Sequence, residues 1–321
     1  MSNWKDSVIL GFLGRLNDRF SSYGENFDIA GKFNVASKIE GLRGLELVYP
    51  ADFVDPVLTL KLLKDHGLEV STVNVNIKGE AKFHHGALTS RDPGIRKQAV
   101  EYMQRGIDLA AETGCGMITM CPLADGYDYS FDLDHAQAWR WFLDGVGEAV
   151  AYRPETKVSL EYKQSEPRHK VILPNAGTAL AACLQVGLPN VGVTMDMGHA
   201  LQAGESSAQA ASLLAQAGRL FLIHVNDNYR NWDWDMIPGS VNPWDMVELI
   251  FFLKKLGYQG WMTSDVAPFR TDPVKTFTAT YRSLLWAEAM VEKVGCDELE
   301  RILREGDSID ALAALQNAAI S

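Results

Sequence analysis

The sequence predicts a (β/α)₈ barrel, in which eight parallel strands close into a ring surrounded by helices, followed by a short helical C-terminal extension. Eight short apolar runs alternate with helical patterns along the 321 residues, and this alternation requires parallel pairing of the strands. A hydrophobic fraction of 47% is sufficient for one large core. An open, doubly wound sheet is the competing fold, but no Gly-x-Gly-x-x-Gly follows an early strand. The barrel is therefore the better prediction.

The first part of the chain contains four of the predicted strands. They are Val8 to Leu13, Gly44 to Val48, Leu68 to Ile77 and Met117 to Met120. The helices expected between them are Phe27 to Lys38, Asp55 to His66 and Asp92 to Glu112. Pro56 suits the first turn of its helix, Gly67 suits a left-handed helix end, and Ser90 is the predicted N-cap of the third helix.

The second part of the chain continues the same alternation. Its predicted strands are Val158 to Glu161, Val191 to Asp196, Leu220 to Ile223 and Trp261 to Asp265. Its predicted helices are Asp134 to Tyr152, Asn175 to Val186, Ala208 to Ala217 and Pro243 to Leu256. From Pro273 to Ala319 the pattern is helical only. We therefore expect a catalytic barrel domain over residues 1–294 and a C-terminal helical extension over residues 295–321.

Charge and cysteine content narrow the class of function. A formal net charge of -11 argues against nucleic acid as a partner, because nucleic-acid binding requires clustered Lys and Arg. The four cysteines are scattered, with no Cys-x-x-Cys pair, and the N-terminus is too polar for a signal peptide, so we expect a reduced cytoplasmic protein. No apolar run approaches the length of a bilayer span, and no membrane partner is expected.

Four consecutive predicted strands end on a residue that can bind a metal. These residues are Glu161, Asp196, His224 and Asp265. In a barrel the carboxyl ends of the strands converge on one mouth, where catalytic groups lie. A single acid at a strand end is common at loop starts, but four in succession indicate a cation site at this mouth.

Two further residues follow these strand ends closely. Lys163 comes two residues after Glu161, so both side chains point to the same side of an extended segment. His199 comes three residues after Asp196, in Asp-Met-Gly-His, and a turn would bring both to one ion. Lysine, histidine and carboxylate are thus expected to share one site.

The loop after His224 contains Asp233 and Asp235, which would point the same way in an extended segment. Two like charges on one face repel each other unless a cation or a shared proton lies between them. We therefore predict two cation sites that share a carboxylate. The first consists of Glu161, Asp196, His224 and Asp265, and the second of Asp196, His199, Asp233 and Asp235. Ligands that are mostly oxygen with some imidazole favour Mg²⁺, Mn²⁺ or Co²⁺.

These motifs resemble those of the xylose isomerases and the related rhamnose isomerases, in running order as well as in type. Val75 to Arg96 looks like the stretch after the family's third strand, and Glu161 to Arg168 is similar to its Glu-Pro-Lys-x-x-Glu-Pro-Arg block. Asp196 to His199 stands where Glu-x-Gly-His is usual. The resemblance also includes the metal loop, His224 to Asp235, and the eighth strand with Ser264-Asp265 and Arg270-Thr271. Asp196 and His224 are more similar to the rhamnose isomerases. The similarity extends to about Val294, and the long C-terminal arm of xylose isomerases is truncated here.

The resemblance implies a divalent-metal-dependent aldose–ketose isomerase that acts on a free small sugar, such as a rhamnose-, ribose- or apiose-like aldose. It implies two metal ions per subunit and a homo-oligomer, dimer or tetramer, since the family forms both. Lys163 would donate to the substrate carbonyl oxygen, while Asp233 and His199 would hold a water that shuttles a proton between hydroxyls.

The presumed sugar pocket departs from the family. Val48 and Tyr49 stand where xylose isomerases have a His-Asp pair for ring opening, Cys121 replaces an aromatic residue, and Lys78 replaces a phenylalanine lent by a neighbouring subunit. The sugar pocket is therefore expected to be rebuilt. Which aldose and ketose it takes, the native metal and the means of ring opening stay open.

The closest alternative is a ketose 3-epimerase or hydroxypyruvate isomerase on the same scaffold, with one metal and two carboxylate bases. Such enzymes need neither Lys163 nor the pair Asp233 and Asp235. A metal phosphodiesterase similar to apurinic endonucleases would require more histidines and a basic face. A non-catalytic sugar-binding barrel would not need Lys163 or two metal sites.

Overall fold

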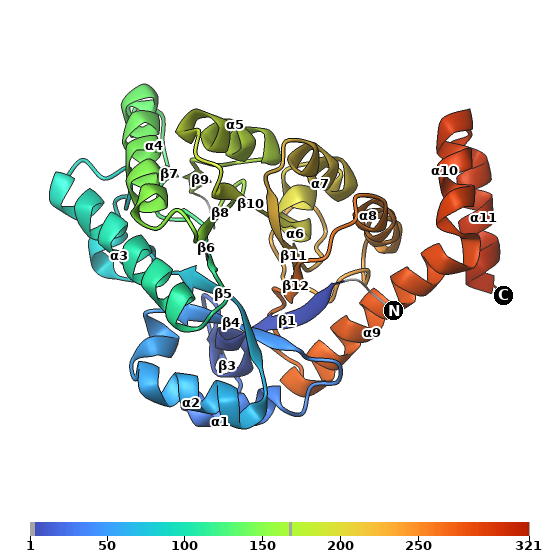
Figure 1. Cartoon of the computed structure of the whole chain (residues 1–321), viewed down its shortest axis with the longest axis horizontal. Helices are drawn as coiled ribbons and strands as arrows, with labels where there is room; N and C mark the ends of the chain where they lie inside the picture. Colours follow the sequence, from blue (N-terminus) through green and yellow to red (C-terminus); the bar gives the residue numbers. More distant parts are fainter. Residues whose placement is uncertain (1–3, 167–168, 321) are drawn as a thin grey trace.

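Eight parallel strands close into a barrel surrounded by helices in the computed structural model (Figure 1), which confirms the predicted fold. The structure describes residues 4–166 and 169–320; Pro167 and Arg168, which end the predicted Glu-x-Lys block, lie outside the described residues. The barrel strands are β1 (Lys5–Ile9), β4 (Gly44–Tyr49), β5 (Glu69–Val75), β6 (Met117–Met120), β8 (Lys157–Glu161), β10 (Val191–Asp196), β11 (Leu220–Val225) and β12 (Trp261–Ser264). Their order around the ring is β1-β12-β11-β10-β8-β6-β5-β4, and β4 pairs with β1 to close it.

Helices that follow the strands cover the outside of the barrel (Figure 1). They are α1 (Ile29–Ala36), α2 (Pro56–His66), α3 (Pro93–Glu112), α4 (His135–Tyr152), α5 (Ala176–Val186), α7 (Ser207–Gln216), α8 (Pro243–Lys255) and α9 (Pro273–Val294), with a short α6 (Met197–Gln202) and the 3₁₀ helices η1 (Leu10–Leu13), η2 (Ala51–Phe53) and η3 (Ala81–Phe83). Gly67 ends α2 in the left-handed conformation, as predicted. Ser90 is not the N-cap of α3. Asp92 fills that position and accepts from Gly94 N at 2.7 Å, because it directly precedes Pro93 at the first helical position.

The first strand lies earlier than the sequence predicts. β1 begins at the polar Lys5 and ends at Ile9, and the apolar residues after it form η1, in which Leu10 and Leu13 are buried. Residues from Lys5 onward pair with Trp261 and the rest of β12. An apolar run shows which residues are buried, and here burial continues past the end of the strand.

Alternation along the strands places small hydroxyl side chains inside the barrel. Thr194 lies within 2.7 Å of both Thr119 and Ser159, through hydroxyl–hydroxyl hydrogen bonds that cross between strands. On β8, Leu160 belongs to the apolar layer under the helices, whereas Ser159 and Glu161 point inward. On β8 this alternation turns the last residue, Glu161, toward the mouth.

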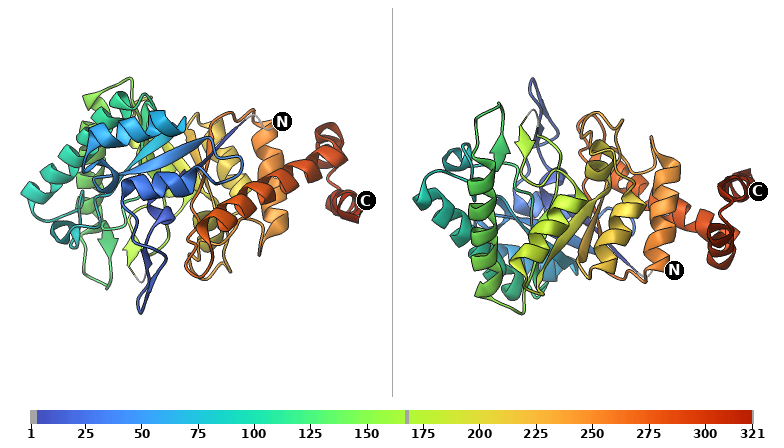
Figure 2. Two further views of the ribbon diagram at one scale, coloured as in Figure 1. Left: turned by 90° about the horizontal axis from the view of Figure 1, so that it is seen from below. Right: turned by 90° about the horizontal axis from the view of Figure 1, so that it is seen from above.

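Two small antiparallel ribbons stand at the mouth and were not predicted. One joins β2 (Leu16–Asn17) to β3 (Ser22–Tyr23), and the other joins β7 (Gly126–Tyr127) to β9 (Lys170–Val171). Both project from the same end of the barrel (Figure 2). Strands of two residues are too short to give an apolar period, so pattern alone does not find them.

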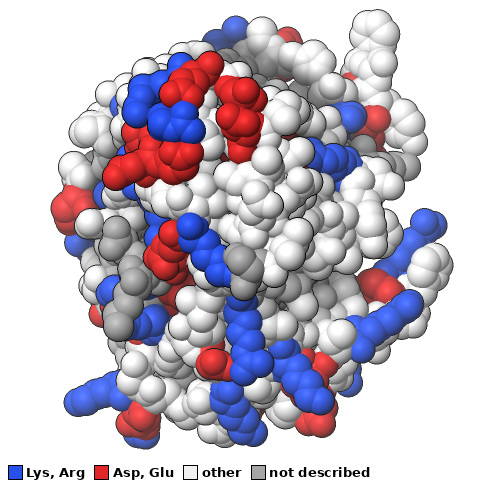
Figure 3. Space-filling view, turned by 90° about the vertical axis from the view of Figure 1, so that its right-hand side faces the viewer, with Lys and Arg blue, Asp and Glu red and all other residues white. Residues whose placement is uncertain are grey.

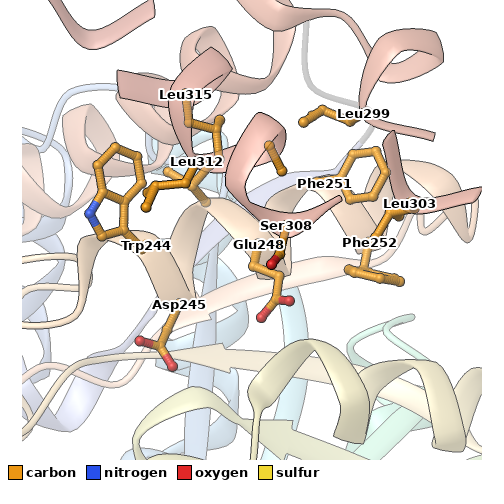
Figure 4. Close-up of a pocket in the computed structure, with 12 residues that line it drawn as sticks. Trp244, Asp245, Glu248, Phe251, Phe252, Leu299, Leu303, Ser308, Leu312 and Leu315 are labelled. Atoms are coloured by element: carbon orange, nitrogen blue, oxygen red, sulfur yellow. The ribbon is translucent and has the colours of Figure 1, made fainter. Parts of the chain in front are cut away.

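The chain ends in a hairpin of two helices, α10 (Cys296–Glu305) and α11 (Ser308–Ile320), which stands beside α9 and away from the barrel (Figures 1 and 2). An apolar groove of about 350 Å³ separates this hairpin from α8, with Phe251 and Phe252 opposite Leu299 and Leu303 (Figure 4). On this side of the molecule acidic and basic side chains occur in mixed groups (Figure 3). No helix within residues 4–166 and 169–320 is long and apolar enough to cross a membrane.

Candidate metal centre

Four potential ligands converge at the carboxyl ends of four adjacent strands. They are Glu161 of β8, Asp196 of β10, His224 of β11 and Asp265, which follows β12. One ligand atom from each residue lies within 4.8 Å of the others, and the first three residues are buried. Asp196 and His224 are directly opposite each other in the strand register. The structure thus brings together all four residues predicted for the first cation site.

The imidazole of His224 is oriented as a metal ligand would be. Its Nε2 lies 3.0 Å from Glu46 Oε2, which fixes the proton on that nitrogen. Its Nδ1 points into the cluster, 3.4 Å from Glu161 Oε1 and 3.5 Å from Asp265 Oδ2, and has no hydrogen-bond partner among the described residues. A buried nitrogen lone pair surrounded by carboxylates is accounted for by a cation.

The carboxylates of the cluster are too close together for all of them to carry charge without a cation. Burial, together with the charges of Asp265 and Glu161, raises the pKa of Asp196 to about 7 in spite of the opposing effect of His199. Burial also favours a raised pKa for Glu161, but His224 outweighs it and holds the pKa of Glu161 well below its usual range. Bringing a divalent cation to this position would stabilise the ionised form of every acid. Three carboxylates and one imidazole fit Mg²⁺, Mn²⁺ or Co²⁺.

The residues predicted for a second cation site line the same mouth but do not converge in the same way. His199 Nε2 lies 3.2 Å from Asp233 Oδ2, and its Nδ1 lies 3.3 Å from Glu161 Oε1. Asp235 has a φ of 45°, so the loop is not extended there, contrary to the premise of the prediction. Among the described residues, only the first cluster has its ligand atoms gathered around one point.

Lys163 lies between the cluster and the loop that follows β11. Its ammonium is 2.7 Å from Asp233 Oδ2 and also forms an ion pair with Glu166. Burial lowers the pKa of Lys163, but Asp233 and Glu166 outweigh it and raise the pKa well above its usual value. Lys163 therefore keeps its proton and is a donor of hydrogen bonds and positive charge, not a base.

One cavity of about 350 Å³ opens at the mouth and is bounded by two different halves of the barrel. The half formed by β8, β10, β11 and β12 provides Glu161 and Asp265 of the metal cluster, Lys163, His199 and the acidic loop. The half formed by β1, β4, β5 and β6 provides apolar residues, the amides of Asn74 and Asn76, the Cys121 thiol and Lys78. The volume falls within the range of about 300–1,000 Å³ that small-molecule sites occupy.

The residues that hold the metal ligands in place were not predicted from the sequence. Glu46 holds His224 and is itself held by Asn74 Nδ2 at 2.7 Å. Asn226 donates to the carboxylate of Asp196 at 3.0 Å, and a side chain on Gly198 would lie 1.7 Å from Asn226 Oδ1. Glu46 could have been identified because it is a carboxylate at an inward position of an otherwise apolar strand. Asn226, two residues after His224, shares its side of the strand.

Comparisons with known proteins cover most of the chain. A family model described as "Xylose isomerase-like TIM barrel" matches residues 33–283. The chain is 29% identical to the xylose isomerase of Thermus thermophilus over 218 residues, which cover 66% of this chain and 56% of that protein. The chain thus spans little more than half the length of the curated relatives that it matches.

Solved structures with a similar fold include several described as ketose 3-epimerases or as similar to one. A D-tagatose 3-epimerase-like protein has a TM-score of 0.71 and 18% identity, with 91% of this chain and 100% of that chain covered. A D-psicose 3-epimerase from Clostridium cellulolyticum H10 has a TM-score of 0.64 and 17% identity, with 88% and 96% covered. At these identities the likeness shows the fold alone.

Proposed function

Because the chain belongs to the xylose isomerase-like TIM barrel family, we propose that it is a divalent-metal-dependent sugar isomerase that interconverts a small free aldose and its ketose. The family and the buried cluster of Glu161, Asp196, His224 and Asp265 support a sugar-active enzyme with a metal. The contact between Lys163 and Asp233 beside that cluster is the observation that favours an aldose–ketose isomerase.

The proposed mechanism assigns separate tasks to these residues. Glu161, Asp196, His224 and Asp265 would hold a divalent metal, which would supply Lewis-acid polarisation of the substrate carbonyl group. Lys163, which stays protonated, donates to the carbonyl oxygen and stabilises the negative charge that develops on it. His199 and Lys163 outweigh burial and hold the pKa of Asp233 well below its usual range. Asp233 therefore stays an acceptor, and with His199 it orients the water that passes a proton between neighbouring hydroxyls.

A second cation held by Asp196, His199, Asp233 and Asp235 is part of the proposal. Asp233 Oδ1 and His199 Nδ1 are buried and have no hydrogen-bond partner among residues 4–166 and 169–320. Two unpaired groups of this kind fit a further ligand. Elemental analysis of the purified protein tests this part, because it distinguishes two ions per chain from one.

A ketose 3-epimerase is the second candidate, and the solved structures of similar fold favour it over the first. The carboxylates of Glu161 and Asp265 lie 3.4 and 3.5 Å from His224 Nδ1, and a pair of carboxylates at a metal is what such an epimerase requires. Against it, Asp265 is one methylene shorter than the glutamate that serves as base in that position, and epimerases do not need Lys163.

The test is a panel of free aldoses and ketoses incubated with the Mn²⁺-loaded protein, using substrate deuterated at carbon two. An isomerase that transfers hydrogen directly between carbons gives ketose labelled at carbon one. Loss of the label to solvent indicates a carboxylate base, and epimerisation of ketoses without aldose formation supports the second candidate. Light scattering of the same sample tests the prediction of a dimer or tetramer.

A further inference from the structure

The two halves of the cavity differ in charge. Every acid that lines the cavity comes from the half that carries the metal cluster. On the half formed by β1, β4, β5 and β6, Lys78 is the one charged residue among the described residues that line it. Across from the metal cluster, the cavity therefore offers a single positive charge.

The Lys78 ammonium is free to bind a ligand. It has no hydrogen bond or ion pair with any residue that the structure describes, whereas Lys163, the other lysine of the cavity, is held by Asp233 and Glu166. Asn76 Oδ1 accepts from the backbone N–H of Lys78 at 3.1 Å and of Gly79 at 2.8 Å, and this turn fixes the start of the lysine side chain.

Lys78 lines the cavity together with the buried Cys121 and the metal ligands Glu161 and Asp265. The Cys121 thiol at the end of β6 is buried, and burial and Glu161 raise its pKa to about 12, while Lys78 acts in the opposite direction. Lys78 is also half-buried, so an anion that binds it is partly removed from water. A charge-assisted hydrogen bond in such surroundings is stronger than one between neutral groups.

We propose that the substrate is an acidic sugar, whose carboxylate at the end remote from the reacting carbons is bound by Lys78. The inference rests on the proposed function, because it requires the other end of the sugar to be held at the metal cluster. A carboxylate fits better than a phosphate, since the one ammonium on this half of the cavity balances a single negative charge. A phosphate dianion is usually held by several donors or a helix N-terminus. Neutral aldoses, which the family resemblance implies, become the poorer substrates.

The experiment compares matched pairs of sugars, each a neutral aldose and the uronic acid with the same carbon skeleton, in the Mn²⁺-loaded protein. We expect kcat/KM to be at least about tenfold higher for the acid, the ratio that one ionic hydrogen bond supports. Lys78→Gln should remove this preference, while Lys78→Arg should retain it. Lys64→Gln, an equal change of charge at the end of α2, is the control and should keep the wild-type ratio.

Binding provides a second measurement that does not depend on turnover. Calorimetric titration of the Mn²⁺-loaded protein with a uronate should give a Kd about tenfold weaker for Lys78→Gln than for the wild type. A preference for the neutral sugar, a preference for sugar phosphates, or an acid preference that survives in Lys78→Gln would overturn the proposal. Metal-dependent turnover of neutral sugars alone would overturn it while the proposed isomerase stands, whereas no turnover of any sugar would count against the isomerase itself.

Discussion

Two groups of acids lie at opposite ends of this barrel, and they differ in what surrounds them. At the mouth, Glu161, Asp196 and Asp265 gather around an imidazole nitrogen that has no hydrogen-bond partner among the described residues. At the base, Asp6 of β1 lies near Glu288 of α9, which forms an ion pair with Lys254 at 3.0 Å.

The same residue type therefore has two different roles. At the base, a lysine already balances one acid, and burial and Glu288 raise the pKa of Asp6 to about 7, so a proton neutralises the other. At the mouth, ligand atoms of four residues converge, and His224 Nδ1 has no hydrogen-bond partner among the described residues. Burial of an acid alone does not indicate function; convergence of unpaired ligand atoms does.

Removal of the metal should have the largest effect and affect the mouth alone. Exhaustive chelation is expected to abolish turnover, and Mn²⁺, Co²⁺ or Mg²⁺ should restore it. Because a ligand that binds only the folded state stabilises it, the metal should also raise the melting temperature. Glu288→Gln at the base should leave metal content unchanged. Full activity in a sample that elemental analysis finds free of metal would contradict the assignment.

Lys163→Met should reduce turnover by about 10²-fold or more, since loss of one donor to a developing negative charge costs about 3 kcal/mol. The variant should still bind metal, because Lys163 contacts Asp233 and Glu166 and is not a ligand. Steady-state kinetics and metal analysis of the same preparation check both points. Turnover close to that of the wild type would mean that Lys163 serves only as an ion-pair partner of the acidic loop.

Glu46→Gln tests whether the mouth depends on support from the other half of the ring. Glu46 accepts from His224 Nε2, and loss of its charge should make the imidazole a weaker ligand. We expect the affinity for Mn²⁺ to fall by about 10- to 100-fold, measured by calorimetric titration. Glu288→Gln is the matched control with the same change of charge at the base. Equal Kd values for Glu46→Gln and the wild type would show that Glu46 is not needed to orient His224.

Much of this architecture can be predicted from local sequence patterns. Strands such as Met117–Met120 were predicted because a short apolar run indicates a buried strand in any fold. Helix ends such as Gly67 were predicted because glycine readily adopts the left-handed conformation that ends a helix. The four first-cluster residues could be grouped because strand ends in a closed barrel must meet. These are consequences of periodicity and topology, which a single sequence contains.

The parts that were missed depend on contacts between distant segments. Glu46 and His224 are 178 positions apart, and nothing in either segment indicates the hydrogen bond between them. The left-handed conformation of Asp235 is set by loop packing, since non-glycine residues rarely adopt it by their own preference. Asp92 rather than Ser90 caps α3 because the helix begins at Pro93, one residue later than predicted. Tertiary contacts decide the first two cases, and the position of Pro93 decides the third.

The smallest expected effect lies at the base, where Asp6→Asn should change stability and leave the metal centre unaffected. The pKa of Asp6 is raised from 3.8 to about 7 by burial and by Glu288, against the opposing charge of Arg43. Because the folded state holds the proton more tightly than the unfolded state, this stabilisation is complete below about pH 4 and is lost as the pH rises through 7.

Asparagine has the same shape as protonated Asp6 and carries no charge at any pH. Its variant should therefore match the wild type below about pH 4 and have the higher free energy of unfolding at pH 8. Urea unfolding of both proteins between pH 4 and pH 8 measures the difference. Parallel stability curves would show that Arg43 keeps Asp6 ionised, as in an ordinary ion pair.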